Sequence, residues 1–320
     1  YPSPLVDFGY DIADYTAIDP LYGSMADFDR LMDEAKKRDI RIIMDLVVNH
    51  TSDHHPWFVE SRSSRNNPKR DWYIWRDGKN GGPPNNWQSW FGHSAWTFDK
   101  TTGQYYYHYF YTEQPDLNWR NPEVRQAVYD VMRFWLNKGV AGFRIDAVSR
   151  LFEDPGLHDD PILPGKNVYG DPNILHKYTD NLPEVHDVLR EMRQLVDQYP
   201  GRPVLISEAD EPNAVELGKM YGKNFDEVQL PMDFQIADVN KLSAPDFRRL
   251  LDEVIALGGQ PHYFFSNHDQ PRQWDRYGDG QSGALAQSAS ASPRSSGSPM
   301  TTLASQSSKA TDGSVARGFR

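Results

Sequence analysis

Apolar residues recur along the chain with two alternating periods. Helical spacing predicts helices over residues 24–39, 121–138, 182–198 and 243–257. Short apolar runs rich in β-branched and aromatic residues predict five strands, over residues 40–48, 141–148, 203–210, 227–234 and 262–270. Strands that alternate with helices in this way indicate a parallel sheet.

Polar residues follow or end four of the five predicted strands. They are Asn49 with His50, Asp146, Glu208, and the segment 267–269. In a (β/α)8 barrel the carboxyl ends of all strands meet at one mouth, whereas distant strands of an open sheet cannot share a site. We therefore predict an α/β fold, a (β/α)8 TIM barrel that is incomplete at both ends of this chain.

The predicted barrel is interrupted by one insertion. Residues 51–113 hold many aromatic residues and Gly/Pro clusters without a helical period, which indicates an irregular inserted subdomain after the third strand. Residues 1–50 would run from the end of strand 2 to strand 3, and residues 114–280 would hold strands 4–7. Residues 281–320 are serine-rich and aperiodic. We interpret them as a low-complexity tail, with a frameshifted reading frame as the preferred hypothesis and a disordered linker as the alternative.

Composition narrows the class of partner. The 320 residues carry a formal net charge of −11, which argues against nucleic acid because phosphate binding needs a basic surface. There is no Cys, so disulfides and thiolate metal sites are excluded. No apolar run has the length of a transmembrane helix, so we expect no membrane partner. The 9 Trp and 17 Tyr suit a protein that binds neutral polar ligands such as sugars.

Two charged residues stand on the predicted strand 141–148. Arg144 and Asp146 are two positions apart, so they point to the same face. Because a buried carboxylate is costly unless it is paired, we expect Arg144 to pair with Asp146 and keep it ionised. Glu208 and Asp269 would bring further carboxylates, and two carboxyl groups about 5–5.5 Å apart are the arrangement of retaining glycoside hydrolysis. An ion pair that only braces the barrel is the structural alternative.

Five motifs then occur in a fixed order: DLVVNH (45–50), QPDLNW (114–119), GFRIDAV (142–148), ISEA (206–209) and SNHDQPR (266–272). Through them the chain resembles the α-amylase superfamily of glycoside hydrolases, in its α-glucosidase and oligo-1,6-glucosidase branch. The segment DFGYDIADY (7–15) resembles the one that opens the glucose pocket in that family. The resemblance covers about residues 1–280.

The resemblance implies three catalytic residues. Asp146 would be the nucleophile that forms a β-glucosyl-enzyme, and Glu208 the general acid/base. Asp269 would hold sugar hydroxyls and stabilise the transition state. Five more residues would bind the substrate: Arg144 by orienting the nucleophile, His50 and His268 by hydrogen bonds to the glucose, Asp7 by gripping the non-reducing end, and Tyr10 by stacking on the sugar.

The resemblance also implies an activity. The chain would belong to a retaining α-glucosidase that acts on terminal α-glucosidic bonds of malto-oligosaccharides or disaccharides. In this family Ala or Thr after the nucleophile accompanies α-1,4 preference and Val accompanies α-1,6, so Ala147 favours α-1,4 bonds. Asp45 and Asn49 we interpret as scaffold of the mouth, and residues 114–118 as a marker of the inserted subdomain.

Three alternatives remain open from the sequence. A trehalose synthase or another transglucosylase would use the same carboxylates, and residues 181–193 resemble that group. A catalytically inactive homologue, such as the heavy chain of an amino-acid transporter, would keep the barrel alone. A starch-binding protein would use its Trp residues and need no acid pair.

The resemblance also bears on cofactors and location. We expect no cofactor and no metal ligand in this chain; the structural Ca²⁺ of the family would lie in an N-terminal loop that precedes Tyr1. The expected partner is a small oligosaccharide, and the expected location is cytoplasmic.

Overall fold

The computed structural model describes residues 1–277, which fall into two units. The first unit comprises Tyr1–Val239 and Ser243–Phe264, and the second comprises Asn240–Leu242 and, of the described residues, 265–277. The tail predicted over residues 281–320 lies outside the described residues.

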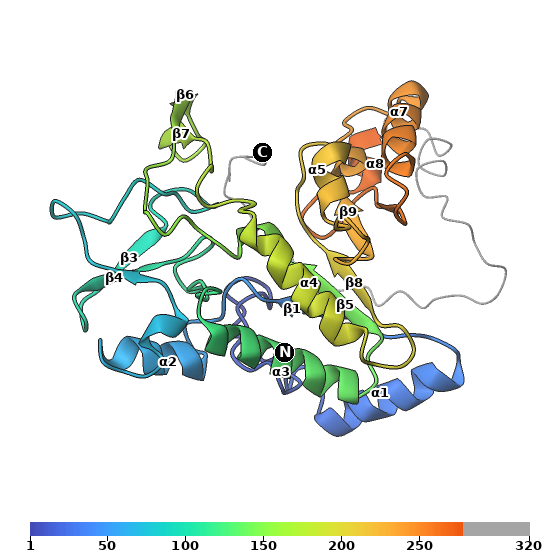
Figure 1. Ribbon diagram of the computed structural model, residues 1–320, viewed down its shortest axis with the longest axis horizontal. Helices are drawn as coiled ribbons and strands as arrows, with labels where there is room; N and C mark the ends of the chain where they lie inside the picture. The colour runs from blue at the N-terminus through green and yellow to red at the C-terminus, as the bar shows by residue number, and fades with distance from the viewer. Residues whose placement is uncertain (278–320) are drawn as a thin grey trace, which may run out of the picture. The chain divides into compact units, whose positions relative to one another are not determined.

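The first unit contains both helices and strands, and helices separate the strands β1, β5, β8, β9 and β10 along the chain (Figure 1). Its helices are α1 (Met25–Lys37), α2 (Pro56–Ser63), α3 (Pro122–Asn137), α4 (Glu184–Val196), α5 (Ala214–Lys219), α6 (Phe234–Ala237) and α7 (Ala244–Ile255), with the 3-10 helices η1 (Arg70–Trp72) and η2 (Val148–Arg150). Its strands are β1 (Met44–Val47), β2 (Trp75–Arg76), β3 (Trp96–Asp99), β4 (Gln104–Tyr107), β5 (Gly142–Asp146), β6 (Ile162–Lys166), β7 (Pro172–Ile174), β8 (Val204–Ser207), β9 (Leu230–Asp233) and β10 (His262–Tyr263). The second unit contributes α8 (Gln273–Tyr277).

A five-stranded sheet forms the centre of the first unit, in the order β1-β5-β8-β9-β10. All four strand pairings are parallel, as the alternating pattern predicts. Each strand therefore lies next to its predecessor among these five, and all carboxyl ends lie at the same edge. The strand β5, with its charged pair, lies between β1 and β8.

Gly142 opens β5 at a point where the backbones of two strands come very close. It has a φ of +140°, and a Cβ atom there would lie 2.0 Å from the carbonyl oxygen of Val204 in β8. Any side chain would therefore push β5 and β8 apart. This requirement explains the glycine at the start of the GFRIDAV motif.

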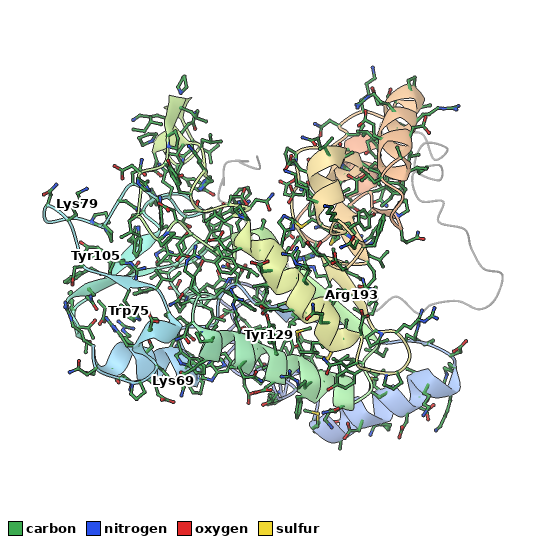
Figure 2. All side chains as sticks on the ribbon, viewed as in Figure 1. Lys69, Trp75, Lys79, Tyr105, Tyr129 and Arg193 are labelled. Atoms are coloured by element: carbon green, nitrogen blue, oxygen red, sulfur yellow. The ribbon has the colours of Figure 1, made fainter. Side chains whose placement is uncertain are left out.

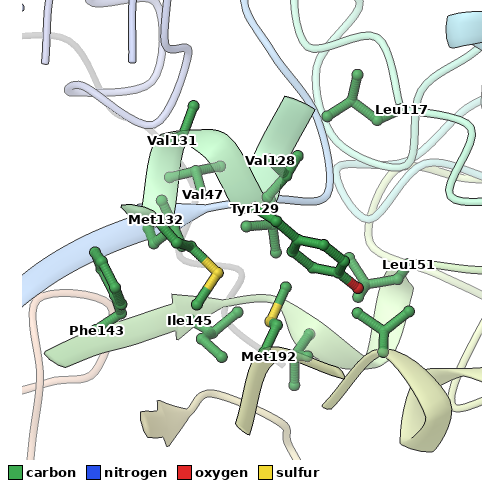
Figure 3. Packing of buried hydrophobic residues seen from close by; sticks show 14 of the residues in the cluster. Val47, Leu117, Val128, Tyr129, Val131, Met132, Phe143, Ile145, Leu151 and Met192 are labelled. Atoms are coloured by element: carbon green, nitrogen blue, oxygen red, sulfur yellow. The ribbon is translucent and has the colours of Figure 1, made fainter. Parts of the chain in front are cut away.

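The helices α3 and α4 cover the central strands with apolar faces. Residues of α3 and α4, such as Met132 and Met192, pack on Phe143 and Ile145 of β5 in a continuous buried cluster (Figure 3). The apolar positions that predict α3 are buried, including Trp135 at 0% exposure. Asn121, the first residue of the helix predicted over 121–138, accepts a hydrogen bond from the backbone of Glu123. Ser24, the first residue of the helix predicted over 24–39, forms a capping box with Asp27 at α1, so both predicted helix starts are confirmed.

The segment between β1 and α3 contains its own small sheet, in the order β2-β4-β3. Trp87 and Trp96 stack 5.7 Å apart in a separate apolar cluster of this segment. Trp75, labelled in Figure 2, instead packs on Phe58 of α2 within the main core. Trp90 is 48% exposed, so the tryptophans of this segment are not all core residues.

Several boundaries differ from the predicted ones. The strand predicted over residues 40–48 is shorter in the structure, where β1 spans Met44–Val47. Ahead of β1, the Ala141 amide donates a hydrogen bond to the Ile42 carbonyl. The strand predicted over residues 262–270 pairs with β9 only at His262 and Tyr263. The helices α2 and α5 and the hairpin β6–β7 were not predicted: the helices have 8 and 6 residues, too few to show a period, and β6 contains Pro164 and Gly165.

Candidate active site

Arg144 forms ion pairs with three carboxylates that lie on or directly after three neighbouring strands. Its Nη1 lies 2.6 Å from Asp146 Oδ1 and 2.9 Å from Asp45 Oδ1, and its Nη2 lies 2.6 Å from Glu208 Oε2. The sheet register explains why these side chains meet. Asp45 is the partner of Arg144 in the pairing of β1 with β5, and Glu208 directly follows β8. The pairing of Arg144 with Asp146 that the strand pattern predicts is confirmed.

The three carboxylates differ in their contact with water. The Asp146 side chain is 10% exposed and that of Glu208 17%, whereas Asp45 is 44% exposed. Asp146 and Glu208 therefore lie in the less polar part of the cluster, where charges interact strongly. Asp45 reaches the same guanidinium from its solvent side.

Burial raises the pKa of Asp146 well above the ordinary aspartate range, and the charge of Glu208 raises it further. Arg144 opposes this rise without cancelling it, while Asp45 and a hydrogen bond with the Glu208 side chain add to it. The predicted pairing with Arg144 is present, and the expectation that it keeps Asp146 ionised stays a prediction. Burial works against the charge of Arg144 as well, but its carboxylate partners outweigh burial and raise its pKa.

Tyr10 joins this cluster to the N-terminal segment. Its hydroxyl donates to Asp45 Oδ2 at 3.0 Å, and the Arg144 guanidinium lies 5.7 Å from the centre of its ring. Asp45 therefore contacts two residues of the candidate site, and its interpretation as scaffold stays a prediction. Its own position in the sequence gives no sign of this, because only the register of β1 against β5 brings it to Arg144.

Gln114 connects two of the predicted substrate-binding residues. Its side-chain nitrogen donates to Asp7 Oδ2 at 2.9 Å and lies 3.0 Å from His50 Nε2. The same His50 Nε2 lies 3.0 Å from the carbonyl oxygen of Tyr10, so a single tautomer satisfies one of these two contacts at a time. Burial lowers the pKa of His50 to about 4, so the ring is neutral at neutral pH. Gln114 is thus a contact residue of this site, which its interpretation as a marker of the inserted subdomain missed.

His268 and Asp269 belong to the second unit and are described within it. Their side chains are 52% and 59% exposed, and His268 Nε2 lies 3.3 Å from Asp269 Oδ2. Asn267 Oδ1 accepts a hydrogen bond from the Asp269 amide, which shapes a turn after the last strand. Their predicted roles in binding and catalysis stay predictions.

Metal binding has no candidate in the part of the chain that the structure describes. Over residues 1–277 no group of three or more His, Asp or Glu side chains is placed to hold a metal ion. The three carboxylates of the cluster meet at a guanidinium group instead. The expectation that the chain uses no cofactor stays untested.

Known proteins resemble this chain over most of its length. The family described as "Alpha amylase, catalytic domain" matches residues 1–293. A probable alpha-glucosidase of Rhizobium meliloti (strain 1021) is 41% identical over 293 residues, which cover 88% of this chain and 53% of that protein. An oligo-1,6-glucosidase of Parageobacillus thermoglucosidasius is 41% identical over 295 residues, 87% of this chain and 51% of its own. The chain therefore spans about half the length of the curated relatives it matches.

A solved structure gives the same result for the fold. The crystal structure of the alpha-glucosyl transfer enzyme XgtA superposes with a TM-score of 0.81 at 40% identity, covering 88% of this chain and 54% of that one. No helix within residues 1–277 combines the length and apolar character needed to cross a membrane. The predicted TIM-barrel fold class is confirmed, and the chain belongs to the α-amylase catalytic-domain family.

Proposed function

We propose that this chain carries the catalytic centre of a retaining α-glucosidase. The observation that supports the proposal most directly is the Arg144 guanidinium, which lies 2.6 Å from both Asp146 and Glu208. Two carboxyl groups with one fixed cation form a compact acid, base and nucleophile set. Relatives named alpha-glucosidase and oligo-1,6-glucosidase support the same class of reaction.

The reaction proceeds in two displacements. An oxygen of ionised Asp146 attacks the anomeric carbon and forms a β-glucosyl ester, while Glu208 gives its proton to the departing glycosidic oxygen. Glu208, now a carboxylate, takes a proton from water as the water oxygen attacks the same carbon and the ester bond to Asp146 breaks. Two inversions restore the α configuration of the released glucose.

The scheme requires Asp146 to react as a carboxylate, whereas burial raises its pKa and so works against that charged form. Arg144 contacts both Asp146 and Glu208 and stabilises the charge on whichever of them is ionised. Asp7, Tyr10 and His50 would bind the sugar, and the roles of His268 in binding and of Asp269 in catalysis stay predictions.

On the basis of Ala147, we propose α-1,4 as the preferred bond. A cytoplasmic location stays a prediction. The first test is a product assay of the complete protein with maltose, isomaltose and sucrose. Release of glucose with retained α configuration, faster from maltose than from isomaltose, is the expected result. Failure to cleave any of the three sugars would contradict the proposal and favour an inactive homologue.

A transglucosylase is the second candidate, supported by the likeness to XgtA, which is named an alpha-glucosyl transfer enzyme. The same glucosyl-enzyme would then react with a sugar hydroxyl in place of water. The product assay separates the two candidates, because transfer yields new disaccharides or longer sugars and little free glucose.

Replacing Arg144 by methionine is expected to move the acidic limb of the pH–rate profile to higher pH. Without the cation, the pKa of Asp146 rises further, so its ionised form appears only at higher pH; removing such a contact shifts a carboxyl pKa by roughly 1 to 3 units. The measurement is kcat/KM against pH on an aryl α-glucoside. Arg133→Met, on the surface of α3, is the matched control. An unchanged acidic limb in Arg144→Met would show that Arg144 does not act on the nucleophile.

A further inference from the structure

The two ring nitrogens of His50 face different neighbours. The side-chain nitrogen of Asn49 lies 3.3 Å from His50 Nδ1. On the other side of the ring, His50 Nε2 lies 3.0 Å from the carbonyl oxygen of Tyr10 and 3.0 Å from the side-chain nitrogen of Gln114. Because burial lowers the pKa of His50 to about 4, the ring is neutral at neutral pH, with one nitrogen that donates and one that accepts.

The two tautomers of this neutral ring satisfy the contacts unequally. With the proton on Nε2, His50 accepts from Asn49 and donates to Tyr10, so two hydrogen bonds form. With the proton on Nδ1, only the bond from Gln114 to Nε2 forms. In that tautomer a donor faces the Asn49 amide and an acceptor faces the Tyr10 carbonyl. The contacts therefore favour the proton on Nε2.

Gln114 does not need His50 as an acceptor. Its side-chain nitrogen donates to Asp7 Oδ2 at 2.9 Å, and its side-chain oxygen accepts from the Tyr111 amide at 3.0 Å. The bond from Tyr111 also fixes which end of the Gln114 amide faces His50. Gln114 thus stays anchored at both ends when the proton of His50 is on Nε2.

The preference for Nε2 requires that the nitrogen of the Asn49 amide, and not its oxygen, faces His50. Burial raises the pKa of the neighbouring Asp116 well above the ordinary range, and hydrogen bonds from the Tyr109 amide and the Asn49 side chain oppose this rise. Asp116 also pairs with His50 in an isolated β-bridge. Asn49 Oδ1 is buried without a partner within residues 1–277. A reversed amide would bury its NH₂ group there and turn its oxygen toward Asp116, so the observed orientation is the favourable one.

Resting on the proposed function, we infer that Asn49 is a positioning residue that holds His50 in the tautomer with its proton on Nε2. The hydrogen bond at one ring nitrogen of a histidine sets the protonation of the other. A neutral ring held in this way can only donate at Nε2, so a sugar hydroxyl that meets this nitrogen has to accept. Asn49 acts on the substrate through His50.

Nitrogen-15 NMR of the complete protein tests the tautomer directly, because protonated and unprotonated ring nitrogens of histidine have well separated chemical shifts. The signals of His50 are assigned by their absence in His50→Ala. In the wild type we expect a protonated Nε2 and an unprotonated Nδ1. In Asn49→Asp an acceptor replaces the donor at nearly the same size, so we expect Nδ1 to become protonated.

A double-mutant cycle tests whether this effect reaches the substrate. Asn49→Asp should lower kcat/KM on maltose by about tenfold, the scale of one hydrogen bond, because Nε2 no longer donates to the sugar in the preferred way. In the His50→Ala background the same substitution should have little further effect. Asn66→Asp, at an exposed position after α2, makes the same charge change and should retain the wild-type rate.

The tautomer and the proposed function are read by different measurements. If the wild-type protein cleaves no α-glucoside, the proposed function fails, and the spectrum still decides on the tautomer. A wild-type proton on Nδ1 would overturn the inference even if Asn49→Asp did not fold, and so would an unprotonated Nδ1 in Asn49→Asp. Equal losses of kcat/KM from Asn49→Asp with and without His50 would show that Asn49 does not act through His50.

Discussion

Asp146→Ala is expected to lower kcat on maltose and on aryl α-glucosides by about 10⁴-fold or more, the scale of removing a nucleophile. The structure supports this size of effect because the Asp146 side chain is 10% exposed and lies 2.6 Å from the Arg144 guanidinium. The measurement is a steady-state rate on both substrates. Asp187→Ala, at an exposed turn of α4, is the matched control and should retain the wild-type rate.

Chemical rescue by azide tests whether the lost activity is due to loss of the nucleophile. In Asp146→Ala the lost carboxylate leaves room for azide, which attacks the anomeric carbon once and gives β-glucosyl azide as the leaving sugar departs. Formation of this inverted product would identify Asp146 as the nucleophile. A variant that still hydrolyses maltose at the wild-type rate would rule Asp146 out.

Glu208→Ala is expected to show an effect that depends on the leaving group. Loss of the general acid should slow maltose cleavage by about 10²–10⁴-fold, because the sugar oxygen leaves poorly without a proton. An aryl α-glucoside with an acidic phenol needs little protonation, so its first step should slow much less. Rates on both substrates measure the difference, and Glu216→Ala on α5 serves as the control.

Azide distinguishes the two carboxylates by the product that it forms. In Glu208→Ala the β-glucosyl ester on Asp146 still forms, and azide attacks it to give α-glucosyl azide. If Glu208→Ala gave β-glucosyl azide instead, the proposed roles of Asp146 and Glu208 would have to be exchanged. Equal losses on both substrates would exclude Glu208 as the general acid.

The sequence alone predicts those parts of the site that depend on position along one strand. The two-residue spacing of Arg144 and Asp146 places both side chains on one face, and the structure shows them in contact. Helix starts follow from local chemistry: the helices predicted from residues 24 and 121 begin there, with Ser24 and Asn121 as their caps. Such features need no knowledge of the rest of the chain.

Features that depend on strand register or on burial cannot be predicted from the spacing of residues along one strand or helix. Asp45 reaches Arg144 because of the pairing of two strands that lie about a hundred residues apart in the chain, and Gln114 reaches Asp7 from the far side of the insertion. The raised pKa of Asp146 reflects how deeply the folded chain buries it and where Glu208 ends up. Ala147 adopts a left-handed conformation that is equally hidden, since alanine gives no signal for it.

The guanidinium shared by Asp45, Asp146 and Glu208 has a consequence for how this site can change by mutation. The effect of altering one of these carboxylates depends on which others remain, because each one changes the charge that the same cation has to balance. Substitutions at the three positions are therefore expected to be non-additive, although they lie on or directly after three separate strands. A substitution at one of these three positions should be harmful even where a combined substitution is tolerated. The three strands therefore constrain one another's evolution.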